Sequence, residues 1–206
     1  MPTALAQPQS LLTPEAYLAA ERQAANRCEY FNGQVFAMAG ASREHVAIVA
    51  NLTYLFVGQF KGRPCSTLGS DMRLKVSETG LYTYPDLMAL CGEPLFDDDQ
   101  RDTLLNPTLI VEVLSDSTER YDRGDKFAHY RRLASLHDYL LVSQRRPRVE
   151  HYTRRGEEWI LREIDGLDGV VRLPDLGCEL PLTEIYDKVT FTAADAAFPR
   201  GEESAN

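Results

Sequence analysis

Two carboxylates stand in segments whose other residues are typical of buried β-strands. Asp86 follows a Tyr-Pro dipeptide between β-prone residues, and Glu112 lies within the apolar run at 109–114. Because a buried carboxylate without a partner is strongly unfavourable, the pair is expected to hold a cation or to form a proton relay. Lys126 follows on a predicted helix and could bring an ammonium group to the same place. These three residues form a candidate metal site.

The chemistry expected of this site is phosphodiester hydrolysis. The oxygen ligands of Asp86 and Glu112 suit Mg²⁺ or Mn²⁺, and either ion would relieve the repulsion between two close anions. A hard cation can activate water, stabilise the charged phosphorane and assist the leaving oxygen, while the Lys126 amine adds charge stabilisation or orients water. Alternatively, Asp86 is a turn residue after proline, and Lys126 belongs to a solvated helix face where Asp122 and Asp125 pair with it.

The elements predicted around these residues are a mixture of helices and strands. Asn32-Gly33 lies between two β-prone runs and predicts a hairpin, because both residues tolerate positive φ. His45 opens an apolar stripe at helical spacing, with Ser42 available as the N-cap. In chain order, we expect a helix at about 13–24, a hairpin at 29–36, a long helix at 42–60, strands at 65–76, 81–91 and 108–114, a helix at 121–133, a strand at 139–143 and hairpins to about 189. This order predicts an α/β (α+β) fold with a mixed central sheet flanked by helices and additional β-hairpins.

Length and composition predict one folded domain. The chain has 206 residues, of which 44% are hydrophobic, enough for one sizeable core. We expect a flexible segment at 1–10, a single domain at 11–190 and a disordered tail at 191–206. The apolar runs are shorter than the roughly 20 residues of a membrane span, and no export signal is visible. The protein is therefore expected to be cytoplasmic, without contact with a membrane.

Cysteine spacing and charge exclude several classes of protein. The four cysteines include no Cys-x-x-Cys pair, so a zinc ribbon is unsupported and free thiols are expected. A net charge of −9 argues against a surface that attracts polyanions everywhere, so any nucleic-acid contact must use a local patch. The candidate patches are arginine clusters, which solvated helix faces explain equally well: Arg120, Arg123, Arg131 and Arg132, then Arg145, Arg146 and Arg148.

Several ordered segments resemble the PD-(D/E)XK nuclease superfamily and, more closely, its Uma-type restriction endonuclease family. The resemblance covers about residues 11–190. The segments that carry it are Glu29-Tyr30-Phe31-Asn32-Gly33, Met38-Ala39-Gly40-Ala41-Ser42 with His45, Ser70-Asp71-Met72-Arg73, Tyr84-Pro85-Asp86, Asn106-Pro107-Thr108 with the run to Ser115, and Tyr121-Asp122-Arg123-Gly124-Asp125-Lys126-Phe127. This is a much more specific pattern than a lone Pro-Asp dipeptide.

The resemblance implies a restriction-endonuclease-like core that acts on DNA. Asp86 and Glu112 would be the ligands of the divalent metal, and Lys126 would be the catalytic lysine. The superfamily's usual lysine lies two residues after the second acid, where this chain has Leu114. Lys126 takes that role only if the lysine has moved onto the helix.

Two further residues are candidates for catalytic roles. His45 could project from its helix toward the site as a ligand or proton carrier, or it could be a hydrogen-bonded core histidine. Glu29 could lie in the outer shell of the metal site, or it could form a salt bridge within its hairpin.

We therefore expect a Mg²⁺- or Mn²⁺-dependent endonuclease that hydrolyses DNA. Serine hydrolase, P-loop, Rossmann and zincin motifs are absent from the sequence. Two alternatives remain: a non-catalytic interaction protein that kept the fold, and a metal-binding regulatory module that acts through protein partners. Pairing through the terminal hairpins could make a homodimer.

Overall fold

The computed structural model describes residues 11–38 and 40–191. The chain opens with helix α1 (Pro14–Glu21), where the Thr13 hydroxyl accepts a hydrogen bond from the Ala16 amide and proline occupies the first turn. Strands β1 (Cys28–Phe31) and β2 (Gln34–Ala37) then form the predicted hairpin. Asn32 and Gly33 have φ values of 49° and 80°, so the turn needs the left-handed backbone that these residue types tolerate.

Helix α2 (Arg43–Phe60) is the long helix that the apolar stripe predicts. The Ser42 hydroxyl caps it by accepting a hydrogen bond from the His45 amide. Its buried residues recur every four positions, which places them on one face of the helix: Ile48, Leu52, Phe56 and Phe60.

The main sheet has six strands in the order β11-β10-β9-β8-β6-β3. Strands β8 and β9 are parallel, and every other pair in the sheet is antiparallel. The bounds are β3 (Cys65–Gly69), β6 (Leu87–Cys91), β8 (Leu109–Leu114), β9 (Asp138–Ser143), β10 (Arg148–Arg155) and β11 (Glu158–Asp165).

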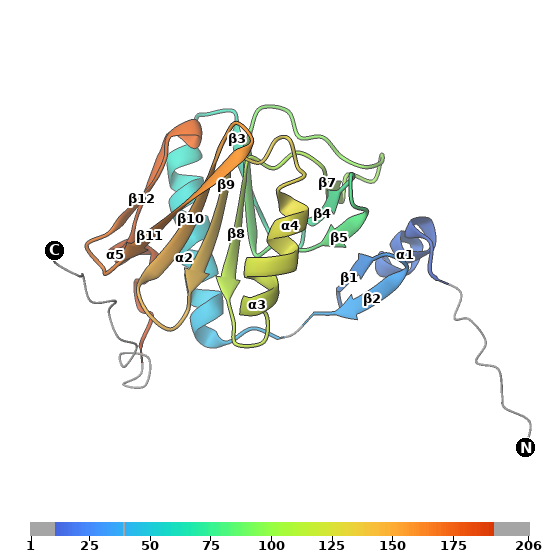
Figure 1. The fold of residues 1–206 in the computed structure, drawn as a ribbon, viewed down its shortest axis with the longest axis horizontal. Helices are drawn as coiled ribbons and strands as arrows, with labels where there is room; N and C mark the ends of the chain where they lie inside the picture. The colour runs from blue at the N-terminus through green and yellow to red at the C-terminus, as the bar shows by residue number, and fades with distance from the viewer. Residues whose placement is uncertain (1–10, 39, 192–206) are drawn as a thin grey trace, which may run out of the picture.

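Helices cover the two faces of this sheet (Figure 1). Leu109, Val111 and Val113 of β8 pack in one cluster with α2, whereas Ile110 and Leu114 pack in a second cluster with the helical segment after β8. That segment consists of α3 (Glu119–Tyr121), a π-helix, η1 (Asp122–Lys126), and α4 (Phe127–Tyr130). Glu112 therefore points from β8 toward the face that carries Lys126.

A second sheet lies to one side, together with α1 (Figure 1). Its five strands run in the order β2-β1-β5-β4-β7. The added strands are β4 (Arg73–Val76), β5 (Leu81–Thr83) and β7 (Thr103–Leu104). The chain ends with the hairpin of β12 (Val170–Leu173) and β13 (Cys178–Pro181), which flank the 3₁₀ turn η2 (Pro174–Leu176), and then α5 (Leu182–Ile185).

Three predicted elements are interrupted in the structure. The strand expected at 65–76 is β3 and β4, and the strand expected at 81–91 is β5 and β6, each pair divided between the two sheets. Pro85 lies at the second break, and the break leaves Asp86 immediately before β6. The helix expected at 121–133 begins at Glu119, passes through the π-helix and ends at Tyr130.

The expectation of four free thiols is wrong for one pair. Cys65 and Cys91 are partners in the β3–β6 register and form a disulfide, whereas Cys28 and Cys178 are free. The two bonded cysteines are 26 positions apart, so their proximity follows from strand pairing and not from local spacing.

The expected terminal segments lie outside the described residues, except for Phe191, which packs near Tyr186. Within 11–38 and 40–191, no helix is long and apolar enough to cross a membrane.

Candidate active site

The structure brings Asp86 and Glu112 together at adjacent strands. The β6–β8 register pairs Leu87 with Val111, so Asp86, one residue before β6, lies opposite Glu112. The Asp86 amide is 3.4 Å from Glu112 Oε2, and Asp86 Oδ2 accepts a 2.7 Å hydrogen bond from the Val113 amide.

Lys126 reaches the same place from the π-helix. Its Nζ lies 3.1 Å from Glu112 Oε1 and 3.4 Å from both Glu29 Oε1 and Asp122 Oδ1. Glu112 is 3% exposed and Lys126 is 6% exposed, so this is a buried ion-pair cluster and not a solvated helix face. The structure therefore places an ammonium beside the second acid, although Leu114 occupies the usual position of the lysine.

Glu29 is also part of this cluster. It is buried on β1, accepts a hydrogen bond from the Thr83 hydroxyl and contacts Lys126. The hairpin thus contributes a carboxylate to the site, and the ion pair that Glu29 forms is with the helix after β8.

His45 contacts the first acid from the first turn of α2. Its Nε2 lies 3.0 Å from Asp86 Oδ2, and its side chain is partly exposed. The ring lies at the first turn of α2 and is hydrogen-bonded to Asp86, so the structure brings His45 to the candidate site.

Two buried residues of the cluster are not among the candidates from sequence. Tyr130 donates a 2.7 Å hydrogen bond to Glu112 Oε1, and Asp122 lies beside Lys126. Asp122, Lys126 and Tyr130 are spaced four residues apart, which is the signal that predicts one shared helix face.

Burial dominates the electrostatics of the site. It raises the pKa of Glu112 to about 8, although the nearby Lys126 ammonium opposes this shift. Burial also raises the pKa of Asp122. It disfavours the charged form of Lys126, but Glu112, Glu29 and Asp122 outweigh that effect and raise the pKa of Lys126 well above its usual value.

The donor set fits a hard divalent cation. Lys126 and Tyr130 both use Oε1 of Glu112, so Oε2 receives only the long contact from the Asp86 amide. His45 and Val113 both use Oδ2 of Asp86, and no described residue donates a hydrogen bond to Oδ1. Glu29, Glu112 and Asp122 surround the Lys126 ammonium and Asp86 lies beside Glu112, so these carboxyl groups would repel one another when ionised, and a divalent cation would relieve that repulsion.

These two oxygens would be supplemented by water or substrate. No group of three or more His, Cys, Asp or Glu side chains within 11–38 and 40–191 has the geometry of a preformed metal cage. Mg²⁺ commonly uses one or two carboxylates and fills its remaining positions with water and phosphate oxygens. The geometry is compatible with that mode of binding.

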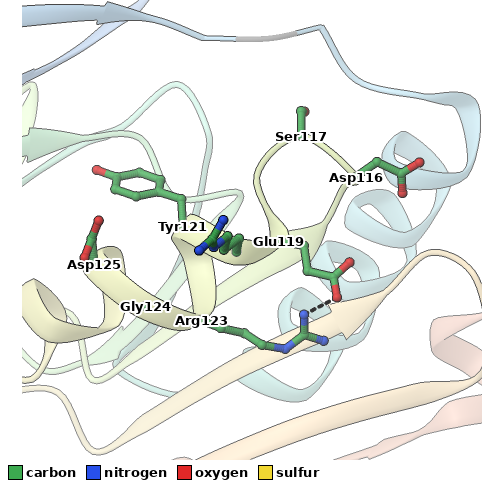
Figure 2. Close-up of a pocket in the computed structure, with 8 residues that line it drawn as sticks. Asp116, Ser117, Glu119, Tyr121, Arg123, Gly124 and Asp125 are labelled. Atoms are coloured by element: carbon green, nitrogen blue, oxygen red, sulfur yellow. Dashed lines mark hydrogen bonds and ion pairs between the residues drawn. The ribbon is translucent and has the colours of Figure 1, made fainter.

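A surface pocket lies beside this cluster, along the helix that carries Lys126 (Figure 2). The Tyr121 ring lines it, and Lys126 Nζ lies 5.7 Å from the centre of that ring. Figure 2 shows the Arg123 guanidinium directed to Glu119, away from Tyr121. Arg123 also pairs with Glu150 at 2.7 Å, whereas the exposed Arg120, another lining residue, forms no ion pair with the described residues.

Comparisons with known proteins give the family. A family model described as "Putative restriction endonuclease", Uma2, matches residues 14–183. The uncharacterized protein sll1609 from Synechocystis is 40% identical over 157 residues, covering 76% of this chain and 89% of that protein. The uncharacterized protein slr1290 from the same organism is 35% identical over 181 residues, covering 87% and 94%.

A solved structure has the same fold. The chain is similar to a crystal structure titled as a putative nuclease belonging to DUF820 from Anabaena variabilis, with a TM-score of 0.67 and 15% identity. The match covers 79% of this chain and 91% of that one. The resemblance to the Uma-type restriction endonuclease family is confirmed, and the chain belongs to the Uma2 family.

Proposed function

We propose that this protein is a metal-dependent endonuclease that hydrolyses phosphodiester bonds in DNA. Membership of the Uma2 family supports a nuclease in general terms. The observation that carries the more specific proposal is the convergence of Asp86 and Glu112 from adjacent strands, with Lys126 Nζ 3.1 Å from Glu112. This arrangement combines oxygen ligands for a hard cation with a fixed positive charge.

Asp86 Oδ1 and Glu112 Oε2 would hold Mg²⁺ or Mn²⁺. A bound ion of this kind supplies charge neutralisation at the phosphate and lowers the pKa of a coordinated water. Val113 and His45 fix the orientation of Asp86 through its other oxygen. Lys126 and Tyr130 do the same for Glu112.

Lys126 stabilises negative charge that develops on the phosphate. Its three carboxylate neighbours keep the amine protonated and limit its rotation, so its charge is positioned before the substrate arrives. Glu29 acts through Lys126 and is anchored in turn by Thr83. Hydrolysis forms a bond from the water oxygen to phosphorus and breaks the bond to the leaving oxygen, which then requires a proton. His45 is the partly exposed group placed to hold or deliver that proton.

The proposal also concerns location and assembly. We place the enzyme in the cytoplasm, where its DNA substrate is accessible, without contact with a membrane. A homodimer is the proposed assembly, and the outer strand β11 of the main sheet supports it because Ile160 and Leu161 are exposed there.

Cleavage of plasmid DNA tests the proposed activity. The full-length protein should cut DNA with Mg²⁺ or Mn²⁺ and not with EDTA. Asp86→Asn and Glu112→Gln should each lower the cleavage rate at least about 100-fold, in line with the loss of a metal ligand. Glu150→Gln is the matched control, because Glu150 is a buried carboxylate in the same sheet that pairs with Arg123.

The outcomes separate an enzyme from its main alternative. Circular dichroism of each variant establishes that the fold is retained. Equal cutting by all three variants would contradict the assigned site. A folded wild-type protein that binds Mg²⁺ in calorimetry but never cuts DNA would indicate a non-catalytic metal-binding or interaction protein.

A further inference from the structure

The outer strand of the β1–β2 hairpin exposes apolar side chains to an unusual degree. All four residues of β2 are exposed, and among the described strands it pairs with β1 alone, at the edge of its sheet. Phe36 is 47% exposed and Val35 is 45% exposed, and Met38 follows at 39%. No packing within the described residues accounts for this surface, so it is a candidate for contact with another molecule.

The two large side chains of β2 lie on opposite faces of the hairpin. Phe36 pairs with Glu29 and Val35 pairs with Tyr30, and residues directly opposite each other in an antiparallel ladder share a face. Tyr30 packs into the tyrosine cluster of α1, whereas Glu29 reaches Lys126. Phe36 is therefore on the active-site face, and Val35 is not.

The distance between Phe36 and the site is short. Paired strands are about 5 Å apart, so the backbone of Phe36 lies one strand spacing from that of Glu29, whose carboxylate contacts Lys126. Phe31, on the same face, packs edge-on against His129 with ring centres 4.7 Å apart. After β2, the chain continues into α2, whose first turn carries His45 (Figure 1). In chain order, β2 thus lies between Glu29 and His45 and flanks the site.

We infer that Phe36 stacks on an unpaired nucleobase next to the phosphate that is cleaved. This inference rests on the proposed function and adds a substrate class: DNA that is single-stranded or carries an unpaired base at the cleavage position. An exposed ring offers stacking to any base, but bases within a duplex are already stacked on each other. A phosphate seated at Glu112 and Lys126 brings its adjacent nucleotide to this face of the hairpin. The position of the ring beside the ionic cluster therefore favours a nucleobase over the apolar surface of a second protein.

The test compares Phe36→Ala with Val35→Ala in the full-length protein. The two residues are adjacent, similarly exposed and on opposite faces of one strand. The probes are a paired duplex and the same duplex with one bulged 2-aminopurine, and binding is measured by fluorescence anisotropy in Ca²⁺ to slow cleavage. Wild type should bind the bulged probe more tightly than the paired one. Phe36→Ala should weaken only the bulged complex, by at least about fivefold, and should abolish the quenching of 2-aminopurine.

The matched variants should still bind the bulged probe more tightly than the paired one. Phe36→Trp and Val35→Ala should behave like wild type, because the first keeps an aromatic ring and the second changes the other face. The inference would be overturned if Phe36→Ala and Val35→Ala changed affinity equally, or if Phe36→Ala weakened binding of both probes equally. Absence of binding to either probe would also overturn it. So would conversion of a dimer to monomers by both alanine variants in sedimentation, because the strand would then contact a second copy of the chain.

Failure of the proposed function has a different signature. Binding of the bulged probe that depends on Phe36, without cleavage in Mg²⁺ or Mn²⁺, supports the stacking contact and contradicts the nuclease. Metal-dependent cleavage that is unchanged in Phe36→Ala supports the nuclease and contradicts the stacking contact.

Discussion

Lys126 Nζ lies 3.1 Å from Glu112 Oε1, although the two residues are on different elements, a π-helix and a central strand. The lysine usual in the superfamily would come from position 114, and Leu114 shares the β8 face with Glu112. The helix after β8 places the Lys126 ammonium beside Glu112, where a lysine at position 114 of β8 would be expected to place its own. We therefore predict that a lysine at position 114 can take over part of the role proposed for Lys126.

A relocation experiment tests this equivalence. Lys126→Met should lower cleavage at least about 100-fold, because a fixed charge at the phosphate contributes several kcal/mol to transition-state stabilisation. Adding Leu114→Lys should recover at least about tenfold of that loss, with cleavage measured under single-turnover conditions. The Leu114→Lys single variant is the control for folding. Full activity in Lys126→Met would show that this amine is dispensable.

The stability of the metal-free protein should depend on Glu112 with a defined sign. Burial raises its pKa from 4.5 to about 8 in the folded protein. Between these values the folded state holds a proton that the unfolded state releases, so the free energy of unfolding falls as pH rises, by at most about 1.4 kcal/mol per pH unit. Above about pH 8 this loss ends because both states are ionised.

Urea denaturation in EDTA from pH 5 to pH 9 measures this dependence. Glu112→Gln should remove the decline between pH 5 and pH 8, whereas Glu150→Gln should follow the wild-type slope. Parallel curves for wild type and Glu112→Gln would mean that Glu112 does not bind the extra proton.

The disulfide should affect stability and not catalysis. Cys65 and Cys91 join β3 to β6 across a separation of 26 residues, and a loop of that size corresponds to about 3 kcal/mol of stabilisation. Cys65→Ser with Cys91→Ser should therefore lower the free energy of unfolding by about that amount, measured by urea titration. Cleavage below the unfolding transition should stay unchanged, because the bond lies at the end of β6 farther from Asp86. Wild type in dithiothreitol should match the double variant, and a loss of cleavage in either case would indicate a link to the site.

Arg120 should contact phosphate from the pocket beside Tyr121. It is exposed and has no ion pair among the described residues, whereas Arg172 pairs with Glu179 at 3.0 Å. Arg120→Ala should weaken binding to all duplex sequences alike and reduce the slope of log K against log salt by about 0.9. Arg172→Ala should leave affinity and slope unchanged. Equal slopes for Arg120→Ala and wild type would exclude this contact.

Local chemistry predicts the parts of the fold that depend on neighbouring residues. The Asn32-Gly33 turn, the Ser42 cap and the buried stripe of α2 all follow from short-range backbone and packing preferences. The division of two expected strands between two sheets does not, because an apolar pattern shows that a strand is buried but not which strand is its neighbour. The Cys65–Cys91 bond depends on the same long-range pairing.

The candidate site shows the same limit. Asp86 and Glu112 are recognisable because charged residues are unexpected in apolar strands, whereas Lys126 is recognisable from its predicted helix and from the segment that resembles the family. Asp122 and Tyr130 lie on the helix face of Lys126, but their contacts depend on how that helix packs over β8. Phe36 has no local signal of a role, since only the β1–β2 register places it on the face of Glu29.

Anomalous diffraction from crystals soaked in Mn²⁺ tests the shared metal site most directly. A peak is expected about 2.0–2.3 Å from both Asp86 Oδ1 and Glu112 Oε2, with the Lys126 amine nearby but not coordinated. The peak should disappear in Glu112→Gln and remain in Glu150→Gln. A peak that avoids both carboxylates, or full occupancy of the position in Glu112→Gln, would contradict a metal site shared by Asp86 and Glu112.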